Sequence, residues 1–279
     1  MPSLRYVVVD VFTDRPLSGN QLAVFTDARG LDAETMQALA LEIGFSETAF
    51  VAPSEGRGHV RIRVFNPRHE MPFAGHPTLG TAFVLAAPLQ LGAIALETGA
   101  GVVEVTLERD ESGRIVFGRM HQPVPVVRLV EDAEALLAVL GVGRSELPVE
   151  VYDNGATHIF VALESEQAVA ALEPDVSALA PFAVTGVNCA AGAGERWKTR
   201  MFWPFGEDAA TGSAAGPLAC HLARHRLVDW GTEIVISQGA EIGRPSTLYA
   251  RADGSDGVIE RVSCGGSAVV VARGEFRLP

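Results

Sequence analysis

Cysteine is scarce in this chain. Its 279 residues include only three cysteines, at positions 189, 220 and 264, and no pair of them has C-x-x-C spacing. An odd number without paired spacing argues against a disulfide framework and against a structural zinc site. Free thiols suit a reducing compartment, so we expect a cytoplasmic protein.

Basic residues are also in the minority. The chain carries 22 Lys and Arg against 34 Asp and Glu, a net charge of −12. Proteins that bind nucleic acid present a basic face, so we expect no nucleic-acid partner. A small anionic ligand is not excluded, because the local field of a helix end can outweigh a distant acidic surface.

Long hydrophobic runs are missing as well. A membrane-spanning helix needs about 20 apolar residues, and no run in the sequence approaches that length. Near the N-terminus a short apolar run is surrounded by Arg5, Asp10 and Asp14, which is typical of a strand and not of a signal peptide. We therefore expect no membrane partner.

The common catalytic motifs are absent. The sequence has no Ser-His-Asp order, no Cys/His nucleophile, no HExxH and no nucleotide-binding glycine pattern. The histidines at positions 69, 76, 121 and 158 lack paired metal-ligand spacing. We therefore expect neither a metal nor a cofactor, and proton transfer between side chains is the chemistry that fits best.

One stretch of sequence occurs twice. Residues 63–82 and 200–219 share Arg, Phe, Pro, Glu, Gly and Ala; residue 63 matches 200 and residue 82 matches 219, so the offset is constant at 137. This offset is about half the chain, and a duplicated half-molecule is the simplest account.

Each copy has the pattern of a strand, a turn containing glycine and a helix. We expect Gly75 and Gly212 to allow the tight turn, and His76 or Ser213 to cap the helix that follows. A helix N-terminus presents unpaired N–H groups and attracts anions. Two matched helix starts predict a site where both ends hold one small anion; the alternative is two well-capped helices with no ligand.

The order of patterns predicts an α+β fold with two similar lobes. We expect lobes at 1–124 and 125–265, joined at Pro123-Val-Pro125, with a C-terminal strand near 266–279 packing on the first lobe. Helical spacing predicts helices over 31–43 and 132–140 and a second central helix that ends near residue 225.

Four acidic residues stand out. Glu47 has apolar neighbours that disfavour its charged form, which would raise its pKa toward the range of a general acid/base. The alternative is a solvated glutamate in a turn. Asp208 precedes the second turn, where acidic residues are common for electrostatic reasons alone. Glu70 and Glu207 are equivalent under the duplication, which predicts a shared structural role in bonding the turn backbone.

Several motifs together resemble a known family, namely Gly19-Asn20, Phe45-Ser46-Glu47-Thr48, Met71-Pro-Phe-Ala-Gly-His-Pro77 and Glu207-Asp-Ala-Ala-Thr-Gly-Ser213. The chain resembles, over its whole length, the PhzF phenazine-biosynthesis family, which has the duplicated fold of diaminopimelate epimerase. That resemblance implies two lobes, each with a curved sheet around a central helix, and a homodimer.

The resemblance also implies an activity, the isomerisation of trans-2,3-dihydro-3-hydroxyanthranilate without a cofactor. In that family one carboxylate removes the proton from C3 and returns it at C1, and the enol then becomes the ketone. By motif, Glu47 matches this carboxylate. The groups matching those that bind the small anionic substrate are His76, Asp208, Thr211, Ser213 and the backbone of Gly75 and Gly212.

The sequence departs from related patterns at two places. Epimerases of this fold carry a cysteine before the glycine of each helix start, where this chain has Ala74 and Thr211, so a two-thiol racemase is not expected. The link Phe205-Gly206 is shorter than in the family. Two alternatives remain: an isomerase of another cyclic amino acid or dihydroaromatic acid, and a non-catalytic protein that binds small anions.

Overall fold

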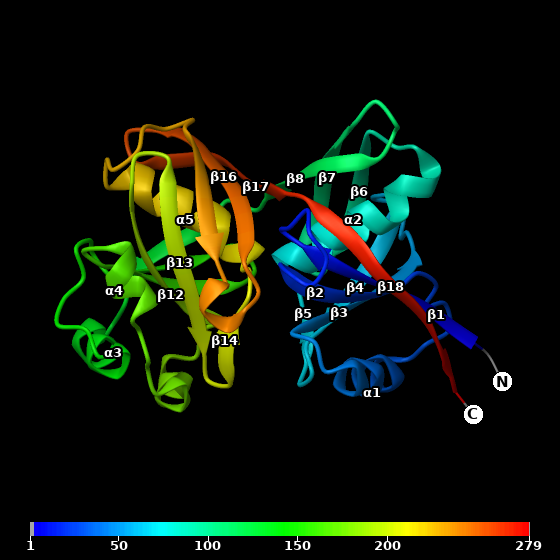
Figure 1. The fold of residues 1–279 in the computed structure, drawn as a ribbon, viewed down its shortest axis with the longest axis horizontal. Helices are drawn as coiled ribbons and strands as arrows, with labels where there is room; N and C mark the ends of the chain where they lie inside the picture. Colours follow the sequence, from blue (N-terminus) through cyan, green and yellow to red (C-terminus); the bar gives the residue numbers. More distant parts are fainter. Residues whose placement is uncertain (1–2, 279) are drawn as a thin grey trace. The chain divides into compact units, whose positions relative to one another are not determined.

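The fold was analysed in a computed structural model that describes residues 3–278 (Figure 1). The chain forms two compact units. Unit 1 comprises the residues up to His121 together with those from Gly265 onward, and unit 2 runs from Gln122 to Cys264. Unit 1 is therefore discontinuous in sequence, and the chain returns to it after completing unit 2.

The sheet of unit 1 mixes antiparallel and parallel pairs. Strand β1 pairs antiparallel with β2 and β18, β2 pairs parallel with β3, and β3 pairs antiparallel with β4. Strand β4 forms a hairpin with β5 and a parallel pair with β6, followed by antiparallel β7 and β8. The strands are β1 (Ser3–Val11), β2 (Asn20–Phe25), β3 (Glu47–Pro53), β4 (Val60–Phe65), β5 (Glu70–Met71), β6 (Ala93–Thr98), β7 (Gly101–Arg109), β8 (Ile115–Gln122) and β18 (Ala268–Arg277).

Unit 2 repeats this pairing scheme. Strand β10 pairs antiparallel with β9 and β11, β11 parallel with β12, and β12 antiparallel with β13. Strand β13 forms a hairpin with β14 and a parallel pair with β15, which is antiparallel to β16. The strands are β9 (Val126–Leu129), β10 (Glu150–Asp153), β11 (Thr157–Ala162), β12 (Gly186–Ala193), β13 (Arg196–Trp203), β14 (Gly206–Asp208), β15 (Glu233–Gln238), β16 (Ser246–Ser255) and β17 (Val258–Gly266).

Each unit has one central helix, α2 (Gly75–Leu89) in unit 1 and α5 (Gly212–Arg224) in unit 2 (Figure 1). Burying a side chain such as Leu79 or Phe83 contributes about 1.5–3 kcal/mol, so these helices anchor their sheets. A Cβ on Gly80 would lie 2.7 Å from Leu22 Cδ2 and 2.8 Å from Val11 Cγ2. Glycine at position 80 therefore lets α2 approach β1 and β2 closely.

The peripheral helices begin and end at identifiable caps. Helix α1 (Ala33–Ile43) starts two residues later than expected, because the Asp32 side chain accepts a hydrogen bond from Thr35 N; it ends at Gly44, whose φ is 70°. Asp132 caps α3 (Ala133–Leu140) in the same way. The shorter helices are α4 (Glu166–Ala170), η1 (Val176–Phe182) and η2 (Ala240–Ile242).

The α+β prediction is confirmed, but four strands were not foreseen, namely β5, β9, β10 and β14. Strand β9 follows directly after Pro125, and it is stabilised by pairing with β10, a contact that local sequence does not reveal. All three cysteines are buried free thiols. Burial raises the pKa of Cys189 and Cys220 to about 12, so these two thiols stay protonated at neutral pH. Among residues 3–278, no helix has both the length and the apolar character needed to span a membrane.

Candidate active site

The two central helices start in the same way, and not as the sequence suggested. Their N-cap residues are Ala74 and Thr211, and neither makes a side-chain capping bond. His76 and Ser213 are the second helical residues, so the prediction that they cap the helices is wrong. An N-cap side chain must come from the residue just outside the helix, and here that residue precedes the glycine. The side chains of His76 and Ser213 are thereby left for other contacts.

The duplicated glutamates have a shared structural role, but their partner is not the turn backbone. Arg63 binds Glu70 through two hydrogen bonds of 2.6 Å, and Arg200 binds Glu207 through bonds of 2.9 and 2.6 Å. Each pair joins the two strands of the hairpin that leads to a central helix. Bidentate pairing fixes the geometry of both hairpins, and it leaves these glutamates no part in acid/base chemistry.

Glu47 is the first residue of β3, where that strand lies beside the start of β2. Its side chain is 17% exposed, and its Oε2 atom is buried without a hydrogen bond from the described residues. Burial raises the pKa of Glu47 to about 7, although a hydrogen bond with Ser46 acts in the opposite direction. The carboxyl group can therefore both accept and donate a proton near neutral pH.

His76 lies next to this carboxyl group within unit 1. Its Nε2 atom is 3.5 Å from Glu47 Oε2 and 3.3 Å from the carbonyl oxygen of Gln21. Its Nδ1 atom is 3.3 Å from Asn20 Nδ2, and Asn20 Oδ1 accepts a hydrogen bond of 3.1 Å from Ser46. The imidazole is thus held on both sides with one edge toward Glu47.

In unit 2 the turn before α5 is held by a single buried amide. Gln238 Oε1 accepts from Thr211 N at 3.1 Å, and its Nε2 donates to the carbonyl of Asp208 and to Thr211 Oγ1, both at 2.9 Å. Thr211 Oγ1 in turn donates to Asp208 Oδ2 at 2.8 Å. The network brings together Asp208 and Thr211, two of the residues singled out from the sequence.

Ser213 also belongs to a buried network in unit 2. Its Oγ atom is 2.9 Å from His158 Nε2, and its backbone carbonyl accepts from Asn154 Nδ2 at 3.0 Å. The preceding carbonyl, that of Gly212, accepts from Gln122 Nε2 at 2.7 Å. Three side chains from distant parts of the sequence therefore fix the first turn of α5.

One cluster in unit 2 has the residue types of a metal site. Ligand atoms of Glu150, His221 and His225 all lie within 4.8 Å of one another. Glu150 Oε2, however, already accepts hydrogen bonds from Arg224 at 2.8 Å and from Tyr152 at 2.9 Å, besides the contacts with both histidines. The guanidinium neutralises the carboxylate and occupies its oxygen, so these residues form a self-contained charge network that fits a cation poorly.

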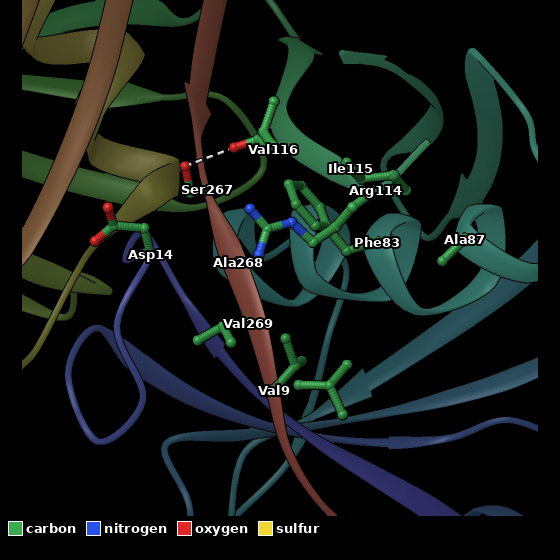
Figure 2. Close-up of a pocket in the computed structure, with 11 residues that line it drawn as sticks. Val9, Asp14, Phe83, Ala87, Arg114, Ile115, Val116, Ser267, Ala268 and Val269 are labelled. Atoms are coloured by element: carbon green, nitrogen blue, oxygen red, sulfur yellow. Dashed lines mark hydrogen bonds between the residues drawn. The ribbon is translucent and has the colours of Figure 1, made fainter. Parts of the chain in front are cut away.

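A pocket of about 480 Å³ lies in unit 1 beside strand β18 (Figure 2). Val269 from the strand and Phe83 and Ala87 from helix α2 line it, and Ser267 Oγ donates to the carbonyl of Val116 at its edge. Neither Glu47 nor His76 is among its lining residues. The pocket is mainly apolar and is separate from the acid/base pair.

Several site residues were missed by reasoning from sequence. His158 was considered only as a metal ligand, and Asn188 and Gln238 were not assigned a role. His221 and His225 have the four-residue spacing of a helical pair, so the sequence alone indicates that they lie close together. Buried amides such as Gln238 carry no local signal, because their partners lie 27 or more residues away.

Comparison with solved structures defines the class of fold. The chain superposes on a predicted epimerase from Pseudomonas aeruginosa with a TM-score of 0.84 at 30% identity, over 99% of this chain and 100% of that one. A phenazine biosynthesis protein of the PhzF family from Bacillus anthracis gives 0.83 at 26% identity, with both chains fully covered. A probable proline racemase from Agrobacterium radiobacter, at 13% identity and a TM-score of 0.72, shares the fold alone.

Sequence comparison places the chain within this class. The model of the phenazine biosynthesis-like protein family matches residues 9–274. A protein of P. aeruginosa named trans-2,3-dihydro-3-hydroxyanthranilate isomerase is 50% identical over 98% of this chain and 99% of its own length, and a namesake from P. chlororaphis is 48% identical over the same shares. The chain belongs to the phenazine biosynthesis-like (PhzF) family, and it is an isomerase.

Proposed function

We propose that this protein isomerises trans-2,3-dihydro-3-hydroxyanthranilate in phenazine biosynthesis, by moving a proton from C3 to C1 without a cofactor. The substrate is inferred from relatives of that name that are about half identical along the whole chain. The reaction type rests on one observation above all: Glu47 has a mostly buried carboxyl group with a pKa of about 7.

Glu47 is the proposed proton carrier. Its ionised form accepts the proton from C3, and the resulting acid returns the same proton at C1, so that the carboxyl group ends the cycle as it began. A group used in both directions works best when its pKa lies near the working pH. His76, 3.5 Å away, is placed to donate a hydrogen bond to the substrate or to steady the carboxyl group.

The remaining site residues are proposed to bind the anionic substrate. The first N–H groups of a helix have no acceptor within the helix, and they attract carboxylates. We assign this role to the backbone of Gly75 and Gly212, and hydrogen bonding to Asp208, Thr211 and Ser213. Support comes from the constant offset between the two copies and from the buried networks that hold each helix start.

We further propose a cytoplasmic homodimer. The free, buried cysteines suit a reducing compartment, and the dimer follows from the family resemblance. Sedimentation at micromolar concentration should give twice the 29.5 kDa of one chain. A monomer mass at that concentration would contradict the proposed assembly without touching the proposed reaction.

The test of the activity is direct. Purified protein is added to trans-2,3-dihydro-3-hydroxyanthranilate and the ultraviolet absorbance is followed. The reaction is then repeated in D₂O, where deuterium should appear at C1 to the extent that the Glu47 proton exchanges before delivery. Turnover of a different cyclic amino acid or dihydroaromatic acid, with none of this substrate, would favour the related isomerase. Binding without any turnover would favour the non-catalytic alternative.

A further inference from the structure

Three side chains of unit 2 form a buried chain of hydrogen bonds that ends at helix α5. Ser213 Oγ lies 2.9 Å from His158 Nε2, and His158 Nδ1 lies 3.3 Å from Asn188 Nδ2. The three residues are 6%, 0% and 2% exposed, so water has little access to the bonds between them. We call these three residues, Ser213, His158 and Asn188, the relay. Which atom donates and which accepts in each hydrogen bond decides the role of the relay.

The direction is set at its inner end, at Asn188. The amide Nδ2 of Asn188 also lies 3.3 Å from the backbone carbonyl oxygen of Ile159. A carbonyl oxygen only accepts hydrogen bonds, so the amide atom that faces it must be the NH₂ group. That same NH₂ group faces His158 Nδ1, which must therefore be the unprotonated, accepting nitrogen of the ring.

The proton of the neutral imidazole is consequently on Nε2. Burial lowers the pKa of His158 to about 3, with Asp153 acting weakly in the opposite direction, so the ring is neutral at physiological pH. A neutral ring with Nδ1 as acceptor carries its single N–H on Nε2, and this N–H donates to Ser213 Oγ. Ser213 is thus an acceptor toward the protein interior.

We propose that His158 and Asn188 are positioning residues that turn the Ser213 hydroxyl outward, so that its own proton is offered to the bound substrate. The hydroxyl has one proton, and with Oγ accepting from His158 that proton points elsewhere. Among residues 3–278, no second hydrogen-bond partner of Ser213 Oγ is found. Ser213 is therefore a fixed donor for an anionic group and not a nucleophile activated by His158, since the Nε2 atom that faces it already carries a proton.

The substrate contact in this inference rests on the proposed function, whereas the direction of the relay does not. The two parts therefore need separate readouts. A structural role for His158 would explain its burial, but it would not predict which ring nitrogen carries the proton. Nor would it predict that the effect of His158 on the reaction passes through Ser213.

The direction of the relay is tested by NMR on the intact protein labelled with ¹⁵N-histidine, with the His158 signals assigned through His158→Phe or, should that variant not fold, His158→Gln. Long-range ¹H–¹⁵N correlations distinguish the two neutral tautomers. We expect the Nε2–H form near pH 7. The Nδ1–H form, or a doubly protonated ring, would overturn the proposal whatever the activity of the protein.

The action through Ser213 is tested by a double-mutant cycle on kcat/KM. Ser213→Ala should lower kcat/KM about 10- to 100-fold, the scale of one hydrogen bond to a charged group. His158→Phe should lower kcat/KM by a similar factor, whereas His158→Gln, which retains an N–H donor, should keep much of the wild-type kcat/KM. In the Ser213→Ala background, His158→Phe should lower kcat/KM little further. Independent, multiplying effects of the two changes would overturn the proposal.

A matched control comes from another buried histidine of unit 2. His221 is 1% exposed and bonds Glu150 and Tyr152 instead of Ser213. The effect of His221→Phe, whatever its size, should multiply with that of Ser213→Ala. A normal kcat/KM in Ser213→Ala would contradict the proposed contact between Ser213 and the substrate. A complete lack of isomerase activity in the wild type would count against the proposed function. In that case the tautomer of His158 would be the remaining test of the direction of the hydrogen bonds.

Discussion

In both units an imidazole lies between the start of the central helix and a strand, but it comes from a different element in each. At the offset of 137, His76 matches Ser213, and the strand pairing matches His158 of β11 with Leu22 of β2. In unit 1 the imidazole comes from the helix and faces the Gln21 carbonyl at 3.3 Å; in unit 2 it comes from the strand and faces the helix serine at 2.9 Å. The start of the central helix therefore contributes an imidazole in unit 1 and a hydroxyl group in unit 2.

This difference shows which features the duplicated units share and which features differ between them. The Arg–Glu pair of each hairpin is kept, because both copies need the same turn geometry. The acid/base group is not kept: the strand pairing matches Glu47, the first residue of β3, with Gly186, the first residue of β12, which has no side chain. The scaffold is therefore symmetric while the chemistry is not, because the carboxyl group of Glu47 has no counterpart at the equivalent position of unit 2. The predictions below test this asymmetry.

The largest effect is expected from Glu47→Gln. The amide keeps the shape of the side chain but accepts no proton, and positioned acid/base groups typically contribute about 10²–10⁴-fold to rate. Turnover should therefore fall at least about 10²-fold, with substrate binding retained. Steady-state kinetics measure both quantities, and Glu70→Gln in the same unit serves as the control. Near-normal turnover in Glu47→Gln would make Asp208 the next residue to test.

The Arg–Glu pairs should differ in their contribution to stability. Glu207 and Arg200 have side chains 8% and 10% exposed, whereas Glu70 and Arg63 are 40% and 21% exposed. Removing one partner of a buried pair costs about 3 kcal/mol, because the other charge stays buried, and an exposed pair contributes less than about 1 kcal/mol. Denaturant unfolding should show Glu207→Gln as clearly more destabilising than Glu70→Gln. Equal losses would mean that the two hairpins are energetically equivalent.

The raised pKa of Glu47 predicts a dependence on pH. Because the folded protein holds this proton more tightly than the unfolded chain, wild-type stability should fall as pH rises from about 4.5 to about 7. At pH 8 the buried charge then costs up to about 3 kcal/mol, which Glu47→Gln should recover; the advantage should vanish below pH 4.5. The acid limb of kcat/KM should follow the same group, with an apparent pKa near 7.

The smallest effect is expected from removal of metals. Dialysis against a chelator should leave kcat/KM unchanged, because the proposed proton transfer uses only side chains. The same treatment probes the Glu150–His221–His225 cluster, where Arg224 takes the place of a cation. A loss of activity that an added divalent metal restores would contradict both the metal-free proton transfer and the conclusion that the Glu150–His221–His225 cluster holds no cation.

The sequence was informative where a signal is local or repeated. The offset of 137 located both helix starts, and the apolar neighbours of Glu47 predicted its raised pKa. It was less informative where partners are distant: the contacts from His158 to Ser213 and from Gln238 to Thr211 join strands to a helix across 55 and 27 positions. The capping error at His76 has a simpler cause, because placing the helix start two residues late changes which side chain caps it.

The return of β18 to unit 1 has a consequence for synthesis of the protein. Strand β1 is flanked by β2 on one side and by β18 on the other, in a register that runs from Ser3 opposite Arg277 to Val11 opposite Ala268. Domains generally fold in the order in which the ribosome makes them, and pairing across such a separation is slow. Here unit 2 is contiguous and can be completed first, whereas the N-terminal unit must wait with an open edge until β18 emerges. A prematurely terminated chain would thus lack a finished unit 1, so only full translation would yield the unit that carries Glu47.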